Sequence, residues 1–225
     1  AGGGAGHCHR PLVTARAFVA EHTVIGQPAL VPEIALHLAS EITPIWQATE
    51  AWLEARSIAP PFWAFAWPGS IALARLILDG AVAVAGLRVL DFAAGCGLAG
   101  IAAAQAGAAL VEACEIDPLA VAAIGLNAAQ NGVELHPLLQ DMVGEACRWD
   151  VILAGDVCYE APMARHITPW LRAMAGQGAR VLMADPGRAY FSSEGVREVG
   201  RMLVPTSREL EDRDAREVVI VEILP

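Results

Sequence analysis

The sequence contains no lysine, and all 15 of its basic residues are arginine. A lysine is needed both for a Schiff-base mechanism and for a phosphate-binding P-loop, so both are excluded. The 25 acidic residues leave a formal net charge of −10. Because phosphate binding needs clustered Lys and Arg, this charge argues against a nucleic acid partner and favours a basic partner.

Cysteine is scarce, and its spacing suggests neither disulfides nor a metal site. The five cysteines are an odd number and contain no CxxC pattern. Reduced thiols and a cytoplasmic location are therefore expected. The short motif His7-Cys8-His9 directly follows the glycine-rich start AGGGAG, which is typical of a partly disordered leader. We predict no metal site there, and assign residues 1–27 to that leader.

One run without charge, residues 92–111, is as long as a membrane-spanning helix. It holds four glycines and a glutamine, and charged residues flank it closely. A loop, a helix and a strand explain it better than a membrane span does. We expect no membrane association and no signal peptide.

Residues 28–225 are expected to form a single domain with a helical extension over residues 28–80. In that extension, Pro32 is predicted to open one helix and Thr43-Pro44 a second, with a third over residues 70–78. The segment PPFWAFAWPGS between the last two gathers four of the 13 aromatic residues within residues 62–67. Its flanking Pro and Gly argue against a regular element, so its spacing alone leaves core packing and ligand contact both open.

From residue 87 onward, short apolar runs alternate with helical patterns, which is typical of a parallel sheet with helices on both faces. The final two runs lie close together and should pair as an antiparallel hairpin. We therefore predict an α/β fold with a mostly parallel, doubly wound sheet of seven strands and a reversed terminal strand. The predicted strands are 87–92, 109–115, 134–139, 149–155, 179–185, 206–212 and 216–224, and the predicted helices are 98–106, 118–130 and 162–175.

The first strand of this sheet runs into a glycine loop, VLDFAAGCGLAG, where Gly95, Gly97 and Gly100 form a GxGxxG pattern. Such glycines let the backbone approach a ligand at the start of a helix. Glu115 ends the next strand, where a carboxylate can bind a ribose diol. Asp91 lies inside the strand, where it would repel a pyrophosphate but suit the ammonium and sulfonium of S-adenosylmethionine. This cofactor is therefore preferred over a nicotinamide dinucleotide.

The stretch from Asp91 to Gly97 resembles motif I of the seven-strand methyltransferases, with Ala93 where a glycine usually stands. Glu115-Ile116-Asp117 resembles their second acidic motif, and Asp141 matches the residue that receives the adenine amino group. The resemblance implies S-adenosylmethionine as cofactor, with a binding set of Trp67, Asp91, Gly95, Gly97, Glu115, Asp141 and Gly155.

A more specific resemblance covers residues 28–222. Asp156-Val-Cys-Tyr159 resembles the DxxY motif of the family-16 protein methyltransferases. Together with PPFWAFAWPGS and ADPGRAYFS, it is similar to segments of the electron transfer flavoprotein β-subunit lysine methyltransferases. The resemblance implies that Asp156 and Tyr159 are catalytic, and that Trp67 lies beside the methionine end of the cofactor.

Several residue roles stay open at this stage. Asp156 is expected to capture and orient a lysine, with a helix N-cap as the alternative. Arg188 and Trp63 are assigned to the substrate, but Arg188 could equally brace a loop, and Trp63 could pack in the core like Phe62 and Phe65. The resemblance leaves Asn127 and Asn131 as helix-surface or capping residues.

The expected function is that of an S-adenosylmethionine-dependent protein N-lysine methyltransferase. The resemblance implies the β subunit of electron transfer flavoprotein as its substrate, and we expect a monomer. A small-molecule N-methyltransferase and a non-catalytic cofactor-binding module are the alternatives.

Overall fold

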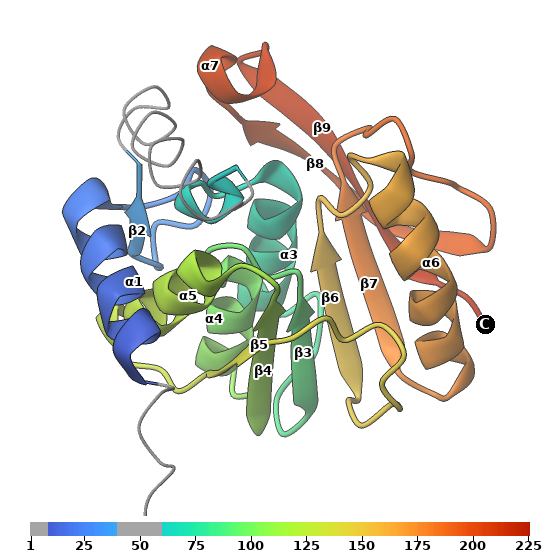
Figure 1. Ribbon diagram of the computed structural model, residues 1–225. Coiled ribbons are helices and arrows are strands. Elements are labelled where there is room, and N and C mark those ends of the chain that lie inside the picture. The colour runs from blue at the N-terminus through green and yellow to red at the C-terminus, as the bar shows by residue number, and fades with distance from the viewer. Residues whose placement is uncertain (1–8, 40–59) are drawn as a thin grey trace, which may run out of the picture.

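The computed structural model describes residues 9–39 and 60–225, and its centre is a sheet of seven strands (Figure 1). The strand order across the sheet is β5-β4-β3-β6-β7-β9-β8. The strands are β3 (Arg88–Phe92), β4 (Leu110–Glu115), β5 (His136–Leu139), β6 (Val151–Gly155), β7 (Arg180–Asp185), β8 (Val196–Pro205) and β9 (Ala215–Ile223).

The first five of these strands run parallel, β8 runs in the same direction as they do, and β9 alone is reversed. β9 inserts between β7 and β8 and pairs antiparallel with both. The predicted mostly parallel sheet with a reversed terminal strand is confirmed. The prediction of a strand over residues 206–212 is wrong, because Ser207 accepts a hydrogen bond from the Leu210 amide and opens the short helix α7 (Arg208–Glu211). The strand that pairs with β9 lies earlier, in β8.

Helices cover both faces of the sheet, which explains why its central strands are continuous apolar runs. The β6 residues alternate: Val151 and Leu153 pack with the helices α3, α4 and α5, while Ile152 and Ala154 pack with α6. The helices are α3 (Pro68–Leu78), α4 (Leu98–Gln105), α5 (Pro118–Gln130) and α6 (Ala161–Gly176). All four lie where the sequence predicts helices.

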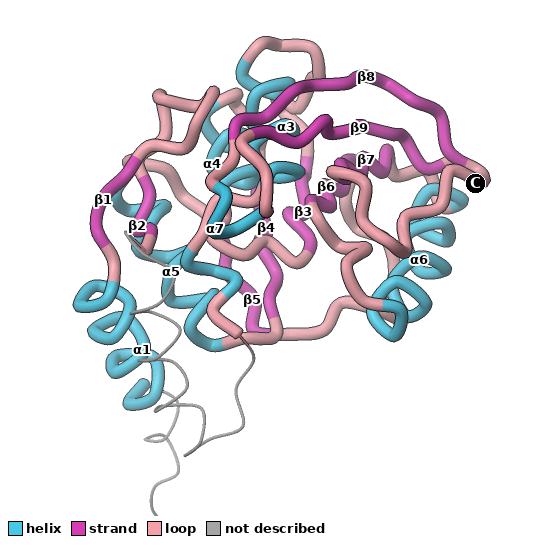
Figure 2. Tube along the Cα trace, turned by 90° about the horizontal axis from the view of Figure 1, so that it is seen from above, coloured by secondary structure: helices cyan, strands magenta, loops and turns pink. Residues whose placement is uncertain are grey.

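The N-terminal segment folds back on α5 (Figures 1 and 2). Helix α1 (His9–His22) packs against α5, and β1 (Val24–Gly26) pairs antiparallel with β2 (Leu36–Leu38). The range assigned to a leader, residues 1–27, therefore contains a helix and a strand among its described residues. The helix expected after Pro32 is wrong, because β2 occupies its second half. The second expected helix, opened by Thr43-Pro44, and His7-Cys8 lie outside the described residues.

Two asparagines, one in α5 and one at its end, hold this segment in place. Asn131 is the C-cap of α5, as expected. Asn127 lies within the helix and is buried, so its assignment to the helix surface or to capping is corrected here. Asn127 is fully buried, and its Oδ1 accepts a hydrogen bond from the His37 amide at 2.7 Å. Asn131 bonds both the amide and the carbonyl of Ala35. Asn127 also donates through Nδ2 to the carbonyl of Cys96 at 2.8 Å, so one side chain joins β2 to the glycine loop.

In the part of the chain that the structure describes, no helix is long and apolar enough to cross a membrane.

Candidate functional site

The glycine loop lies at the carboxyl edge of the sheet, between β3 and α4. Gly95 and Gly97 have φ angles of +56° and +80°, a region that favours glycine. A Cβ added at Gly95 would meet no atom of the described residues within 4 Å, whereas one at Gly97 would lie 3.2 Å from Ile124 Cγ1. Gly95 is therefore the open point of the loop, where a ligand can approach the backbone, and Gly97 is needed for packing against α5.

Asp91 lies beneath this loop and is almost fully buried. Its Oδ2 accepts a hydrogen bond from the Gly100 amide at 2.7 Å, in the first turn of α4. Burial raises the pKa of Asp91 to about 8, and the charge of Glu115 adds to this rise. A carboxylate at a helix N-terminus is stabilised by the helix dipole, so Asp91 ties β3 to the start of α4.

Glu115 ends the neighbouring strand β4 and faces the same loop. Its Oε1 accepts from the Gly95 amide at 2.8 Å, and its Oε2 from the Ile116 amide. Burial raises the pKa of Glu115 to about 6, although these two backbone hydrogen bonds oppose the rise. The carboxylate is therefore held beside the open residue Gly95, as the prediction of a ribose ligand requires.

Asp141 follows the next strand, β5, and is half exposed. Its Oδ1 accepts from the Val143 amide at 3.0 Å, and its Oδ2 lies 2.8 Å from His166 Nε2 on α6. Burial alone would raise the pKa of Asp141, but the bonds from Val143 and His166 outweigh it and the pKa is lowered. The sequence analysis missed His166, since nothing in the chain ties residue 166 to residue 141 before the fold is known.

These residues fit S-adenosylmethionine. Three acidic side chains lie in or directly after the adjacent strands β3, β4 and β5, around a loop whose Gly95 leaves open space. The carboxyl ends of parallel strands are where open α/β sheets bind nucleotide-like ligands. Asp91, Gly95, Glu115 and Asp141 would hold the cofactor there.

Asp156 follows β6, the strand beside β3, and marks a second group of side chains at the same edge. It is buried, and its backbone has a φ of +56°. Its Oδ2 accepts from the Gly69 amide at 2.5 Å, and its Oδ1 accepts from Arg188 Nη2 at 2.7 Å. Burial raises the pKa of Asp156 to about 6, and the Arg188 charge opposes the rise.

The alternative interpretation of Asp156 as the N-cap of the following helix is wrong, because the N-cap of α6 is Glu160 and Asp156 caps nothing there. Asp156 instead binds the first turn of α3, a helix from a distant part of the chain. Gly155 serves the same contact: a Cβ at Gly155 would lie 2.7 Å from Ser70 Oγ. This explains the need for glycine at position 155 by packing, and its predicted cofactor contact remains a prediction.

Trp67 lies next to Asp156 at the start of α3. Its Nε1 donates to the Phe62 carbonyl at 2.8 Å, and the Arg188 guanidinium carbon lies 5.8 Å from its ring centroid. The rings of Phe62 and Tyr159 are 5.3 Å apart, so Tyr159 continues this aromatic wall. Tyr159 is 36% exposed, and burial raises its pKa to about 12, so its hydroxyl stays protonated.

Comparisons with known proteins agree with this geometry. A model of the ribosomal protein L11 methyltransferase family (PrmA) matches residues 73–183. The electron transfer flavoprotein β-subunit lysine methyltransferase of Xenopus laevis is 40% identical over 185 residues, which are 80% of this chain and 74% of that protein. The human protein of the same name is 37% identical over 80% of this chain and 70% of its own length.

The chain belongs to the family of electron transfer flavoprotein β-subunit lysine methyltransferases. Among solved structures, the magnesium protoporphyrin IX methyltransferase of Synechocystis PCC 6803 with bound S-adenosylmethionine has a TM-score of 0.50 at 18% identity, covering 80% of this chain and 92% of that one. This likeness concerns the fold alone. The fold is that of the S-adenosylmethionine-dependent methyltransferases, and S-adenosylmethionine is the cofactor.

Trp63 lies in the core, where the packing interpretation of the sequence analysis places it. It is 1% exposed and packs in a cluster with Ala15, Val19 and Leu119 of α1 and α5. Its burial supports the packing interpretation and gives no support to a direct substrate contact. Arg188 does lie at the site, where it braces Asp156.

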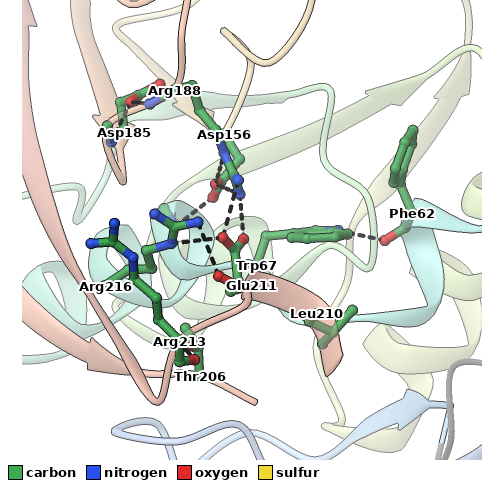
Figure 3. A network of polar contacts seen from close by, with 12 residues as sticks. Phe62, Trp67, Asp156, Asp185, Arg188, Thr206, Leu210, Glu211, Arg213 and Arg216 are labelled. Carbon is green, nitrogen blue, oxygen red and sulfur yellow. Dashed lines mark hydrogen bonds and ion pairs between the residues drawn. The ribbon is translucent and has the colours of Figure 1, made fainter. Parts of the chain in front are cut away.

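Glu211 is a second site residue that sequence reasoning missed. It lies on α7 and is 3% exposed, and both of its carboxylate oxygens accept from Arg188 (Figure 3). Arg216 donates to the same carboxylate at 2.9 Å. Ser207 followed by two glutamates is a helix-start signal that could have placed α7, but no local pattern indicates that Glu211 points back to Arg188.

Proposed function

We propose that this protein is a protein N-lysine methyltransferase that transfers methyl groups from S-adenosylmethionine to the β subunit of electron transfer flavoprotein. The names of its relatives, which match at up to 40% identity, support this substrate. We further propose that it acts as a monomer in the cytoplasm. The free thiols of Cys96, Cys114, Cys147 and Cys158 support a reducing compartment.

The observation that carries the proposal is that Asp156 and the ring of Trp67 both face one cation, the Arg188 guanidinium, which donates to Asp156 at 2.7 Å and lies 5.8 Å from the Trp67 ring centroid. The buried carboxylate and the indole come from β6 and α3, at the same edge of the sheet as the glycine loop. A carboxylate beside an aromatic face binds a cation, here a lysine ammonium, through charge and cation–π attraction. The relative from Xenopus laevis named for the electron transfer flavoprotein β subunit matches 80% of this chain, whereas two relatives named for ribosomal protein L11 match 47% and 54%, which favours the former substrate.

The bound cofactor supplies a methyl group activated by its sulfonium. The acceptor must be a neutral amine, and losing a proton from lysine at pH 7 costs about 4–5 kcal/mol, because its ordinary pKa is about 10.4. Asp156 holds and orients the ammonium, and the aromatic wall of Trp67 and Tyr159 removes water from it, which favours the neutral form. The proton passes to water, and positioning supplies most of the acceleration.

Labelling tests the proposal directly. The purified protein is incubated with methyl-labelled S-adenosylmethionine and either the isolated β subunit of electron transfer flavoprotein or a host lysate. We expect a labelled β subunit, with the label on lysine by mass spectrometry, and much slower labelling by the Asp156→Asn variant. Because the chain lacks lysine, methylation of its own lysine side chains cannot occur.

Each other result contradicts the proposal in a distinct way. A labelled small molecule would indicate the small-molecule methyltransferase, and labelled L11 would indicate the ribosomal enzyme. Binding of cofactor with no label transferred would indicate a non-catalytic module.

A further inference from the structure

Arg188 occupies the place where a substrate cation is expected. Its guanidinium faces both groups that the proposed function assigns to the lysine: it donates to Asp156 at 2.7 Å and lies 5.8 Å from the Trp67 ring centroid. A carboxylate whose oxygens accept from Gly69 and Arg188 has its strongest acceptor positions filled. A lysine ammonium must therefore displace Arg188 from Asp156 before Asp156 can hold it.

Glu211 offers Arg188 a second carboxylate at that moment. The Nη2 atom of Arg188 already bonds Glu211 Oε1 at 2.5 Å as well as Asp156 Oδ1, and its Nη1 bonds Glu211 Oε2 at 3.1 Å. The guanidinium is thus shared between two buried carboxylates from β6 and α7 (Figure 3). A small rotation can transfer it wholly to Glu211 without leaving its charge unpaired in the interior.

The charges around this point leave room for one more cation. Asp156 and Glu211 accept from the guanidinium of Arg188, and Glu211 accepts from that of Arg216 as well. Asp185, which accepts from the backbone amide of Arg188, is a third carboxylate, so three carboxylates and two guanidinium groups sum to −1. The negative charge of Asp185 raises the pKa of Asp156 further, so the excess negative charge acts on Asp156. An incoming ammonium would neutralise the group, and an anionic or neutral side chain would not.

We propose that Glu211 is a positioning residue for the acceptor lysine: it takes over Arg188 when the lysine ammonium replaces that guanidinium on Asp156 beside Trp67. This inference rests on the proposed function and identifies the feature that the acceptor must have, a primary ammonium able to compete with an internal arginine. Glu211 itself touches neither cofactor nor substrate.

Steady-state kinetics with Glu211→Gln test this role, using the β subunit of electron transfer flavoprotein and saturating S-adenosylmethionine. Without the second carboxylate, Arg188 stays on Asp156, so KM for the protein should rise about tenfold, the size of one charge-assisted hydrogen bond, while kcat changes by less than about threefold. Glu211→Asp keeps the charge and should restore most of the loss. Asp214→Asn is the matched control: it breaks an exposed ion pair with Arg208 on the same hairpin and should leave KM unchanged.

Arg216→Gln provides a second test, in which KM should not rise as it does in Glu211→Gln. It frees Glu211 from its competing partner and strengthens the hold of Glu211 on Arg188, so KM should fall or stay level. A merely structural role of the network would raise KM, lower kcat or lower the melting temperature in both variants alike, and would overturn the inference. An unchanged KM in a folded Glu211→Gln protein would also overturn the inference. If Glu211→Gln does not fold, a raised KM in Arg216→Gln would overturn the inference by itself.

The inference and the proposed function fail in different ways. A wild-type enzyme that labels no lysine in the β subunit refutes the proposed function before any variant is compared. A wild-type enzyme that labels it, with variants whose KM values do not move as stated, refutes the role of Glu211 alone.

Discussion

The backbone amide of Gly69 donates to the Oδ2 of Asp156 across 2.5 Å, and this contact joins the first turn of α3 to the end of β6. No larger residue fits at position 69. A Cβ there would lie 2.5 Å from both the Ala184 carbonyl oxygen and Asp156 Oδ2. The placement of the Asp156 carboxylate therefore depends on glycine at position 69.

Gly69→Ala should push α3 away from the sheet edge and move Asp156. We expect a loss of about 1–3 kcal/mol in the free energy of unfolding, the usual range for overpacking, together with a severe loss of methylation. Denaturant unfolding and labelling on the same sample measure both. Gly176→Ala is the matched control, since a Cβ at Gly176 meets no atom within 4 Å. Equal effects of the two substitutions would contradict this account.

Asp156→Asn removes the charge but keeps an oxygen that can accept from Gly69. Because a bond from an ammonium to a carboxylate contributes about 1.5–3 kcal/mol, kcat/KM for the protein substrate should fall about 10–200-fold. The dissociation constant of S-adenosylmethionine, measured by calorimetry, should stay within threefold or so. A folded variant with full activity would exclude Asp156 from acceptor binding.

The rate should also depend on the ionisation of Asp156. Its pKa of about 6 means that the carboxylate is charged above this pH and neutral below it. At saturating cofactor, kcat/KM for the protein substrate should therefore fall as the pH drops through about 6. Saturation matters because Glu115 has a pKa near the same value and affects cofactor affinity. A profile without an acid limb between pH 5 and 7 would count against the assigned role.

Asn127 should matter for cofactor affinity although it lies outside the loop. Its bond to the Cys96 carbonyl supports the glycine loop, so Asn127→Ala should weaken S-adenosylmethionine binding about tenfold, in the range of one buried hydrogen bond. Asn131→Ala removes comparable bonds to the N-terminal segment but does not touch the loop. Calorimetry on both variants separates the roles, and similar losses of affinity would show that Asn127 acts only through the N-terminal segment.

Asp91 should make the cofactor-free protein less stable at higher pH. Its folded pKa of about 8 lies above its ordinary value of 3.8, so its stabilising contribution is complete below pH 4 or so and is lost as the pH rises through about 8. Asp91→Asn keeps an acceptor for the Gly100 amide without a charge. Between pH 6 and 8.5 the wild type should lose at least about 1 kcal/mol more than the variant. Parallel slopes in thermal melts would contradict the assignment of this loss to Asp91.

The sequence predicts where Asp91, Gly95 and Glu115 lie in the fold because its signals there are local. Asp91, Gly95 and Glu115 each lie at a strand end or a tight turn. The buried parallel strands that lead to them are recognisable in the sequence as continuous apolar runs. Asp117 caps α5 as its place before a proline indicates. The prediction fails where contacts span the chain: Asn127 bonds His37 across 90 positions, and Glu211 bonds Arg188 across 23.

The part of the site that would bind the acceptor lysine combines local sequence signals with contacts that span the chain. Asp156 and Tyr159 stand out as a motif, but the αL backbone of Asp156 and its bond to Gly69 have no sequence signature. The error at residues 206–212 has a simple cause, since a single turn of helix and a short strand have similar composition. Only the capping contact of Ser207 distinguishes them.

The insertion of β9 between β7 and β8 also constrains the order in which the sheet can assemble. β8 is made before β9, yet in the sheet of described strands its only hydrogen-bonded neighbour is β9. A folding chain must therefore leave β8 unpaired until β9 has been made, and β8 joins the sheet only through β9. We infer that the hairpin closes late, and that the part of the site that would bind the acceptor lysine matures after the part that would hold the cofactor.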